Sequence, residues 1–221
     1  DVYKRQIFRF DLRGDMMRTF NTERKSMTPN TLLLDRLDYT AQIIDERISR
    51  ASSMQTCMVS SHALNELSDK VIAHLAHILL SKGHRVLVVN PNIEELSYNQ
   101  FLAPKPHHIA GSIQNIALNK FIVDTDYEQI NYLQVSTSDG TIDEDEMQRI
   151  GSGDEALYTK YDICLMAVDT EHEMLRQFML NSADMNITII GEDNNQTKPM
   201  KQLIESLHAN NVYNIGVLLN Q

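Results

Sequence analysis

The residues from Val59 to Lys70 are arranged as in a phosphate-binding loop. An apolar run ends at Val59, and after it come Ser60-Ser61-His62-Ala63-Leu64-Asn65-Glu66-Leu67-Ser68-Asp69-Lys70 and a helical pattern. In such a strand–loop–helix unit, backbone N–H groups and the amino end of the helix can hold the phosphates of a nucleotide. This loop contains no glycine, and its single lysine comes last. The context therefore predicts phosphate chemistry, while the residue types that perform it are missing.

Five short apolar runs predict the strands that position this unit: residues 57–59, 86–89, 163–168, 187–190 and 215–219. Residues 132–135 are a sixth candidate. The runs do not alternate with polar residues, which is typical of strands covered on both faces. Helical patterns span 32–48 and 69–82, and Gly83 is expected to cap the second helix. This order predicts an α/β fold with a doubly wound, mostly parallel sheet, helices on both faces, and ligands at the carboxyl ends of the strands.

The unit resembles the bacterial tyrosine kinase family of capsule and exopolysaccharide synthesis, within the MinD/ParA superfamily of phosphate-loop proteins. In that family the strand ends in Thr-Ser and continues through Pro-Gly-Glu-Gly-Lys-Ser-Thr. The two segments align without a gap. Leu64 falls on the proline, Asn65 and Leu67 on the two glycines, Ser68 on the lysine and Asp69 on the magnesium-binding serine. The resemblance implies a phosphate loop whose binding residues have been replaced.

Two further motifs of the family have changed as well. Its Asp-x-Asp motif appears here as Asn90-Pro91-Asn92, so both carboxylates are neutral amides. Its third motif, Tyr-Asp followed by four apolar residues and an aspartate, puts Ala167 at the carboxylate position. Asp169 comes two residues later, and a two-residue insertion in a longer strand would restore it to that role. Both alternatives stay open.

The altered loop is predicted to reject a triphosphate. Leu67 places a branched side chain where glycine would let phosphate oxygens approach. A lost lysine at Ser68 and an added carboxylate at Asp69 each cost about 4 kcal/mol at roughly 4 Å and a dielectric of about 20. Micromolar binding is only about 8 kcal/mol in total. Lys70 cannot compensate, because two residues along a helix turn it by about 200°. Asp69 also has a simpler interpretation as a first-turn acid that the helix dipole favours.

The resemblance extends to the end of the chain. Residues 211–220 are similar to the family's Gly-x-Asn-x-x-Gly-Val-Val-Leu-Asn, which makes Asn220 a candidate contact for a nucleotide base. We expect a degenerate phosphate-loop domain over residues 30–221 and an N-terminal extension over residues 1–29. Residues 1–6 resemble a translated sequencing adapter, and we expect the natural N-terminus to differ.

The other candidate sites have ordinary explanations. His74 and His77 are three residues apart on one helix face but lack a third ligand, so no metal site is predicted. The acidic residues 143–146 are typical of a solvated helix start. They lie in the polar segment 136–153, which we expect to be the most mobile surface.

The composition excludes some partners. The formal net charge is −10 and no basic stripe is present, which argues against nucleic acid. No apolar run approaches the roughly 18 residues of a membrane helix. Cys57 and Cys164 lie in apolar runs as small buried side chains, typical of a reducing compartment. We expect a cytoplasmic location, or the inner face of the membrane as part of a longer membrane protein.

Together these features predict a non-catalytic regulatory domain in the biosynthesis or export of capsular polysaccharide or exopolysaccharide, with no cofactor and no metal. Its expected partner is a protein, which the resemblance implies to be a membrane polysaccharide co-polymerase or a related kinase. Self-association into a homo-oligomer is left open. The alternative is an active ATP- and Mg-dependent tyrosine kinase, or a MinD/ParA-like ATPase, with a rearranged site that uses Asp169.

Overall fold

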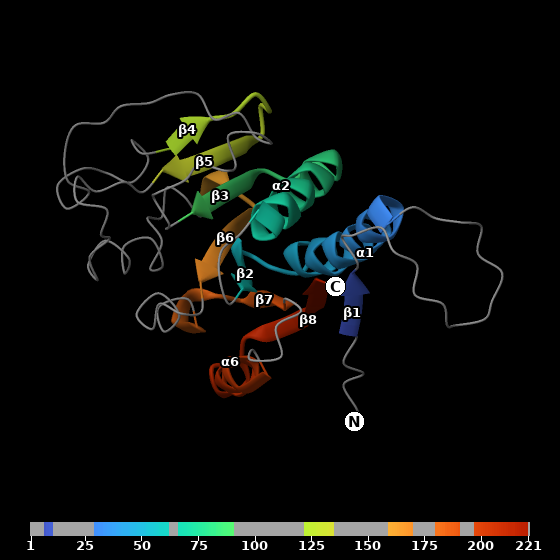
Figure 1. Cartoon of the computed structure of the whole chain (residues 1–221). Helices are drawn as coiled ribbons and strands as arrows, with labels where there is room; N and C mark the ends of the chain where they lie inside the picture. Colours follow the sequence, from blue (N-terminus) through green and yellow to red (C-terminus); the bar gives the residue numbers. More distant parts are fainter. Residues whose placement is uncertain are drawn as a thin grey trace.

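The chain forms a sheet with helices packed on both of its faces (Figure 1). The computed structural model describes residues 7–10, 29–61, 66–90, 122–134, 159–169, 180–190 and 197–220. Its strands are β1 (Ile7–Phe10), β2 (Gln55–Ser61), β3 (Val86–Asn90), β4 (Ile122–Asp124), β5 (Ile130–Gln134), β6 (Ile163–Asp169), β7 (Met185–Ile190) and β8 (Tyr213–Asn220). Its long helices are α1 (Pro29–Ile48), α2 (Glu66–Ser81) and α6 (Thr197–Ala209). None of the helices in these ranges is long and apolar enough to cross a membrane.

The strand order across the sheet is β1-β8-β7-β2-β6-β3-β5-β4. Neighbouring strands are parallel except β4 and β5, which are antiparallel. The chain leaves β2, forms α2 and returns as β3, and β6 lies between these two strands. This arrangement confirms the predicted doubly wound, mostly parallel sheet. In such a sheet, ligands bind at the carboxyl ends of strands where the order reverses, which is beside β2.

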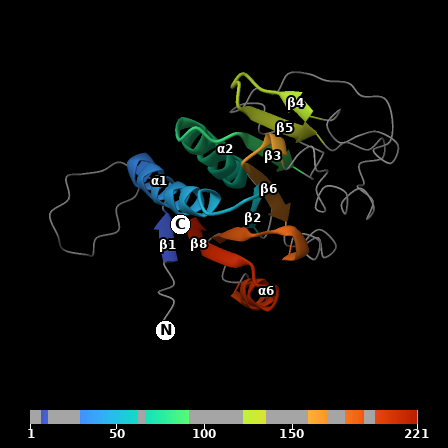
Figure 2. The same cartoon turned by 180° about the vertical axis from the view of Figure 1, so that it is seen from behind.

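The two faces of the sheet have separate cores. Val59 and Ala167 belong to the core that packs against α1 and α2, which we call the α1/α2 side. Met58 and Met166 alternate with them and pack with Leu203 of α6 on the other face, the α6 side. Figures 1 and 2 show α1 and α2 together on one face and α6 on the other. Burial on both faces explains why the strand runs are continuously apolar.

The helix ends follow from residues that tolerate a left-handed backbone. Gly83 follows α2 with φ 91°, and the N–H of His84 donates to the carbonyl of Leu79 at 3.1 Å. This is a Schellman cap, and it confirms the predicted C-cap. Asn211 follows α6 with φ 58° and ends that helix in the same manner. Each cap turns the chain directly into the next strand.

All six predicted apolar runs form strands, but β1 and β4 were not predicted. β1 lies within residues 1–29 and pairs with the last four residues of β8. It therefore extends the sheet beyond β8, and the division of the chain at residue 30 stays a prediction. The segment 136–153 lies outside the described residues.

Candidate functional site

The motif positions converge on the carboxyl edge of the sheet, where β2, β6 and β3 end beside the first turn of α2. The described positions are Leu67, Ser68 and Asp69 in α2, Asn90 at the end of β3, Ala167 and Asp169 in β6, and Asn220 at the end of β8. Leu64, Asn65 and Asn92 lie outside the described residues. The structure thus places the three motifs at one edge, with β7 separating β8 from β2.

Ser68, which the sequence resemblance aligns with the phosphate-loop lysine, is fully buried, at 0% exposure. Its Oγ donates to Oγ of Ser61, the last residue of β2, across 3.2 Å. Ser61 is also buried, at 2% exposure. The hydroxyl contact joins the end of the strand to the first turn of the helix. This position therefore supplies a packed, hydrogen-bonded side chain rather than a cation.

The helix begins earlier than the resemblance implies. α2 starts at Glu66, so Glu66 and Leu67, which align with the loop, are helical. Only residues 62–65 separate α2 from the end of β2. A phosphate loop must wrap its backbone N–H groups around the anion before the helix begins. In this chain the helix already includes two of the positions that the resemblance aligns with the loop.

The third motif lies along β6. Ala167 is 0% exposed on the α1/α2 side and pairs with Val59 of β2. The strand continues to Asp169, whose backbone position pairs with Ser61. β6 therefore has the additional length that the insertion alternative requires. The register leaves both Ala167 and Asp169 as candidates for the motif carboxylate position.

The α6 side of the same strand end carries a buried hydrogen-bond chain. Oγ of Ser60 donates to Oδ1 of Asn186 at 2.9 Å, and Nδ2 of Asn186 donates to Oγ1 of Thr188 at 2.7 Å. All three side chains are fully buried. The chain satisfies polar groups that would otherwise be costly to bury, and it ties β2 to β7. Sequence analysis missed it, because strand pairing cannot be deduced from an apolar run.

The opposite, amino edge of the sheet is held by carboxylates. Arg85 donates from Nη2 to Oδ1 of Asp162 at 2.7 Å, from Nε to Oδ2 at 3.2 Å and from its backbone N to Oδ2 at 2.8 Å. These hydrogen bonds lower the pKa of Asp162. At β2, Oδ2 of Asp184 accepts from the backbone N of Thr56 at 2.8 Å. Asp162 is the aspartate of the Tyr-Asp pair with which the third motif begins, and it ties β3 to β6.

Solved structures of known proteins share the fold described above. No protein-family model matches the sequence, and no curated protein matches it. The kinase domain of the Escherichia coli tyrosine kinase ETK is similar, with a TM-score of 0.63 and 12% identity over 98% of this chain and 90% of that one. The BceF tyrosine kinase domain has a TM-score of 0.60 and 14% identity, covering 87% of this chain and 78% of that one. The septum site-determining protein MinD from Pyrococcus horikoshii OT3, complexed with Mg-ADP, has a TM-score of 0.57 and 16% identity, covering 75% and 70%.

The chain has the fold of bacterial tyrosine kinase domains and of MinD. At these identities the similarity establishes the fold and leaves the chemistry to the individual residues. Beside β2 in this kinase fold lie the side chains of Ser61 and Ser68 from the first motif and of Ala167 from the third. None of them can neutralise a phosphate or coordinate magnesium as a carboxylate does.

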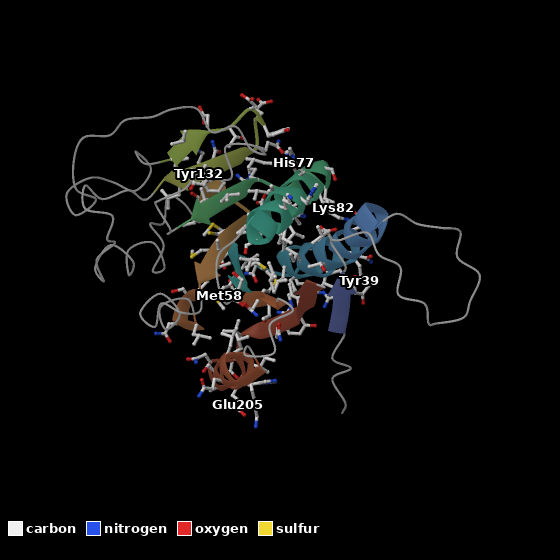
Figure 3. All side chains as sticks on the ribbon, in the orientation of Figure 1. Tyr39, Met58, His77, Lys82, Tyr132 and Glu205 are labelled. Atoms are coloured by element: carbon white, nitrogen blue, oxygen red, sulfur yellow. The ribbon has the colours of Figure 1, made fainter. Side chains whose placement is uncertain are left out.

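Of the two histidines of α2, His77 packs against the turn between β4 and β5. Burial lowers the pKa of His74, and the nearby His77 and Lys70 lower it further. The His77 ring, labelled in Figure 3, meets the ring of Tyr127 edge-on with centroids 4.2 Å apart. Within the described ranges, no group of three or more His, Cys, Asp or Glu side chains could hold a metal ion.

The two cysteines are packing residues of this kinase fold. Cys57 and Cys164 are both buried and both are free thiols. Burial raises the pKa of both thiols, that of Cys164 to about 12. Neither is therefore available as a thiolate nucleophile at neutral pH.

Proposed function

We propose that this chain is a non-catalytic regulatory domain with a tyrosine kinase fold, which acts through protein contacts in the assembly or export of capsular polysaccharide or exopolysaccharide. The observation that supports this most is the burial of Ser68 and its hydrogen bond to Ser61. An ATP-binding loop needs an exposed cation at this position, directed at the phosphates. Here the position belongs to the packing between β2 and α2.

The estimated free energy of binding also disfavours a triphosphate at this position. A triphosphate placed at the start of α2 would meet no lysine from position 68, and Asp69 would bring a carboxylate into the first turn. Each change costs about 4 kcal/mol at roughly 4 Å and an effective dielectric of about 20. The whole free energy of micromolar binding is about 8 kcal/mol. The amino end of one helix cannot supply the difference, because it contributes about 0.3–2 kcal/mol.

The partner that fits this function is a protein of the same system. We infer that the chain binds a membrane polysaccharide co-polymerase or a related tyrosine kinase, in the cytoplasm or at the inner face of the membrane. The kinase fold supports this choice, because a domain that keeps the shape of a kinase can occupy the place of one in a complex. Loss of the binding residues then leaves docking as the remaining activity.

Isothermal titration calorimetry with Mg-ATP tests the proposal. We expect the wild-type chain to show no binding tighter than about 100 µM, which corresponds to roughly 5.5 kcal/mol. A double variant, Ser68→Lys with Asp69→Ser, restores two of the family's residues and should bind more tightly than the wild type. The double variant Ser81→Lys with Asp69→Ser makes the same change in net charge but puts the lysine at the far end of α2, and it serves as the matched control. Wild-type binding below about 100 µM would defeat the proposal.

One observation favours the alternative of a rearranged, active site. β6 reaches Asp169, and the backbone of Asp169 pairs with Ser61 at the carboxyl edge of β2. An active enzyme that used this carboxylate would hydrolyse ATP or phosphorylate tyrosine with magnesium present. In that case Asp169→Asn would abolish turnover measured with γ-labelled ATP. We expect the wild-type chain to release no labelled phosphate above a protein-free blank.

A further inference from the structure

The pairing of β7 with β8 contains an irregularity. Asn186 pairs with Asn214, but the next residue, Ile187, pairs with Gly216. Ile215 is therefore an additional residue in β8 that has no partner of its own in β7. This is a β-bulge, a feature that bends a strand and redirects the side chains that follow it.

The bulge changes which face the end of β8 presents. Before it, Tyr213 and Ile215 pack on the α1/α2 side. After it, position 216 pairs with Ile187 and position 218 pairs with Ile189, and both isoleucines belong to the α1/α2-side core. Paired positions of neighbouring strands share a face, and positions two apart share a face. Positions 216, 218 and 220 therefore fall on the α1/α2 side, whereas a regular strand would assign them to the α6 side.

Asn214 spans the bulge. In one orientation of its amide, Oδ1 of Asn214 accepts from Nδ2 of Asn186 at 3.4 Å. With the amide turned over, the side-chain nitrogen donates to the carbonyl of Asn186 at 3.1 Å and to the carbonyl of Gly216 at 3.2 Å, which satisfies both ends of the amide. These two carbonyls flank the irregular step in the ladder, where a bulge interrupts the regular pairing. On the same strand, Asn186 is anchored to Ser60 of β2 by the 2.9 Å hydrogen bond. β7 is thus held in register with β2, and the shift is confined to β8.

We propose that Asn214 is a positioning residue for the candidate site. By holding the bulge, it assigns position 220 to the side of the sheet that α2 covers. Position 220 then lies at the same edge and on the same face of the sheet as position 167. The same device positions β1, because β1 pairs only with positions 217–220, all of which follow the bulge. This role does not require that the site bind or reject nucleotide, so it stands or falls separately from the proposed function.

Methyl NMR of the full chain tests the face assignment directly. We expect nuclear Overhauser contacts between the methyl groups of Leu218 and Ile189, and none between Leu219 and Ile189. Contacts from Leu219 instead would overturn the proposal, because they would show that β8 continues without the shift.

The substitution Asn214→Asp tests the role of the amide. Aspartate has the same shape but no donor, and its charge faces two carbonyl oxygens. We expect about a fivefold faster amide hydrogen exchange at positions 216–219, equivalent to about 1 kcal/mol, and weaker contacts between Leu218 and Ile189. The control is Asn210→Asp, because Asn210 is exposed and its side-chain nitrogen donates to the carbonyl of Ser206 at the end of α6, away from the bulge. If the two variants show the same exchange and the same contacts, Asn214 does not hold the bulge.

Discussion

The two edges of the sheet use charge in opposite ways. At the amino edge, Asp162 accepts a hydrogen bond from the backbone N–H of Arg85, just before β3, and its carboxylate also forms an ion pair with the Arg85 guanidinium. Asp184 accepts a hydrogen bond from the backbone N–H of Thr56 near the start of β2. At the carboxyl edge beside β2, the described motif side chains are two serine hydroxyls and an alanine. Charge therefore persists where it connects strands, whereas Ser61, Ser68 and Ala167 beside β2 carry none.

This difference shows which parts of a resemblance the fold itself requires. Asp162 of the third motif keeps its residue type, and the structure gives it a connecting role between β3 and β6. Ser68 and Ala167, which the sequence resemblance aligns with a lysine and a carboxylate of the family, are uncharged and packed into the protein. The same fold can thus carry different side chains at these positions, which is why shape alone does not establish activity.

The largest expected effect comes from restoring the motif carboxylate at the carboxyl edge with Ala167→Asp. Ala167 is 0% exposed in the α1/α2-side core, so aspartate would be a buried charge without a partner. We expect a loss of about 3–5 kcal/mol in the free energy of unfolding, measured by urea denaturation. Ala167→Ser, which adds one uncharged oxygen, should cost much less. An Ala167→Asp protein as stable as the serine control would show that this position opens toward a site.

The next effect is expected at Ser68, where Ser68→Lys restores the loop lysine. The substitution removes the hydrogen bond to Ser61 and forces a long side chain into a fully buried position. We expect a loss of about 2–3 kcal/mol, somewhat less than for Ala167→Asp because lysine can extend its charge toward solvent. Ser81→Lys, on the exposed end of α2, should change the stability by less than about 0.5 kcal/mol. Equal stability of the two lysine variants would contradict the packed role of Ser68.

Much of the fold was predictable because it depends on local pattern. The continuous apolar runs at residues 57–59 and 163–168 predicted strands covered on both faces, and the structure confirms both. Gly83 predicted the end of α2, because the left-handed residue that follows a helix is usually glycine. β4 was missed because its three residues are too few to show a period, and β1 was missed because its pairing with β8 is wholly non-local.

The candidate site was predictable as a place but not as a set of contacts. The strand–loop–helix order located it at the carboxyl end of β2, and the spacing selected Ser68 and Ala167. The bond between Ser61 and Ser68 was not foreseen, because it depends on where α2 begins, and the helix starts at Glu66 rather than after the loop. The link between Arg85 and Asp162 requires β3 and β6 to be neighbours, which the order of residues along the chain does not reveal.

At the amino edge we expect a smaller effect from Asp162→Ala. The substitution removes the acceptor for the backbone N of Arg85 and for its guanidinium. The aspartate side chain is 27% exposed and that of Arg85 is 47% exposed, so water replaces part of the interaction. We expect a loss of about 1–2 kcal/mol in urea denaturation. Arg85→Lys keeps the positive charge but loses the planar guanidinium, and it should lower the free energy of unfolding less than Asp162→Ala does. If Arg85→Lys lowers it more, the ion pair rather than the backbone hydrogen bond stabilises this edge.

The smallest effect is the acid sensitivity of the same edge. Hydrogen bonding lowers the pKa of Asp162 through Arg85 and that of Asp45 through His84. Below the ordinary aspartate pKa of about 3.9, the unfolded chain binds more protons than the folded chain. The stabilisation is therefore complete above about pH 4 and is lost as the pH falls through the lowered values. Arg85→Gln should remove the Asp162 part of this loss in urea titrations between about pH 3 and pH 6, whereas Lys201→Gln should not, because it breaks only the exposed pair with Glu205 on α6 (Figure 3). If both variants lose stability as steeply as the wild type, the ion pair at the amino edge is not the origin of the acid dependence.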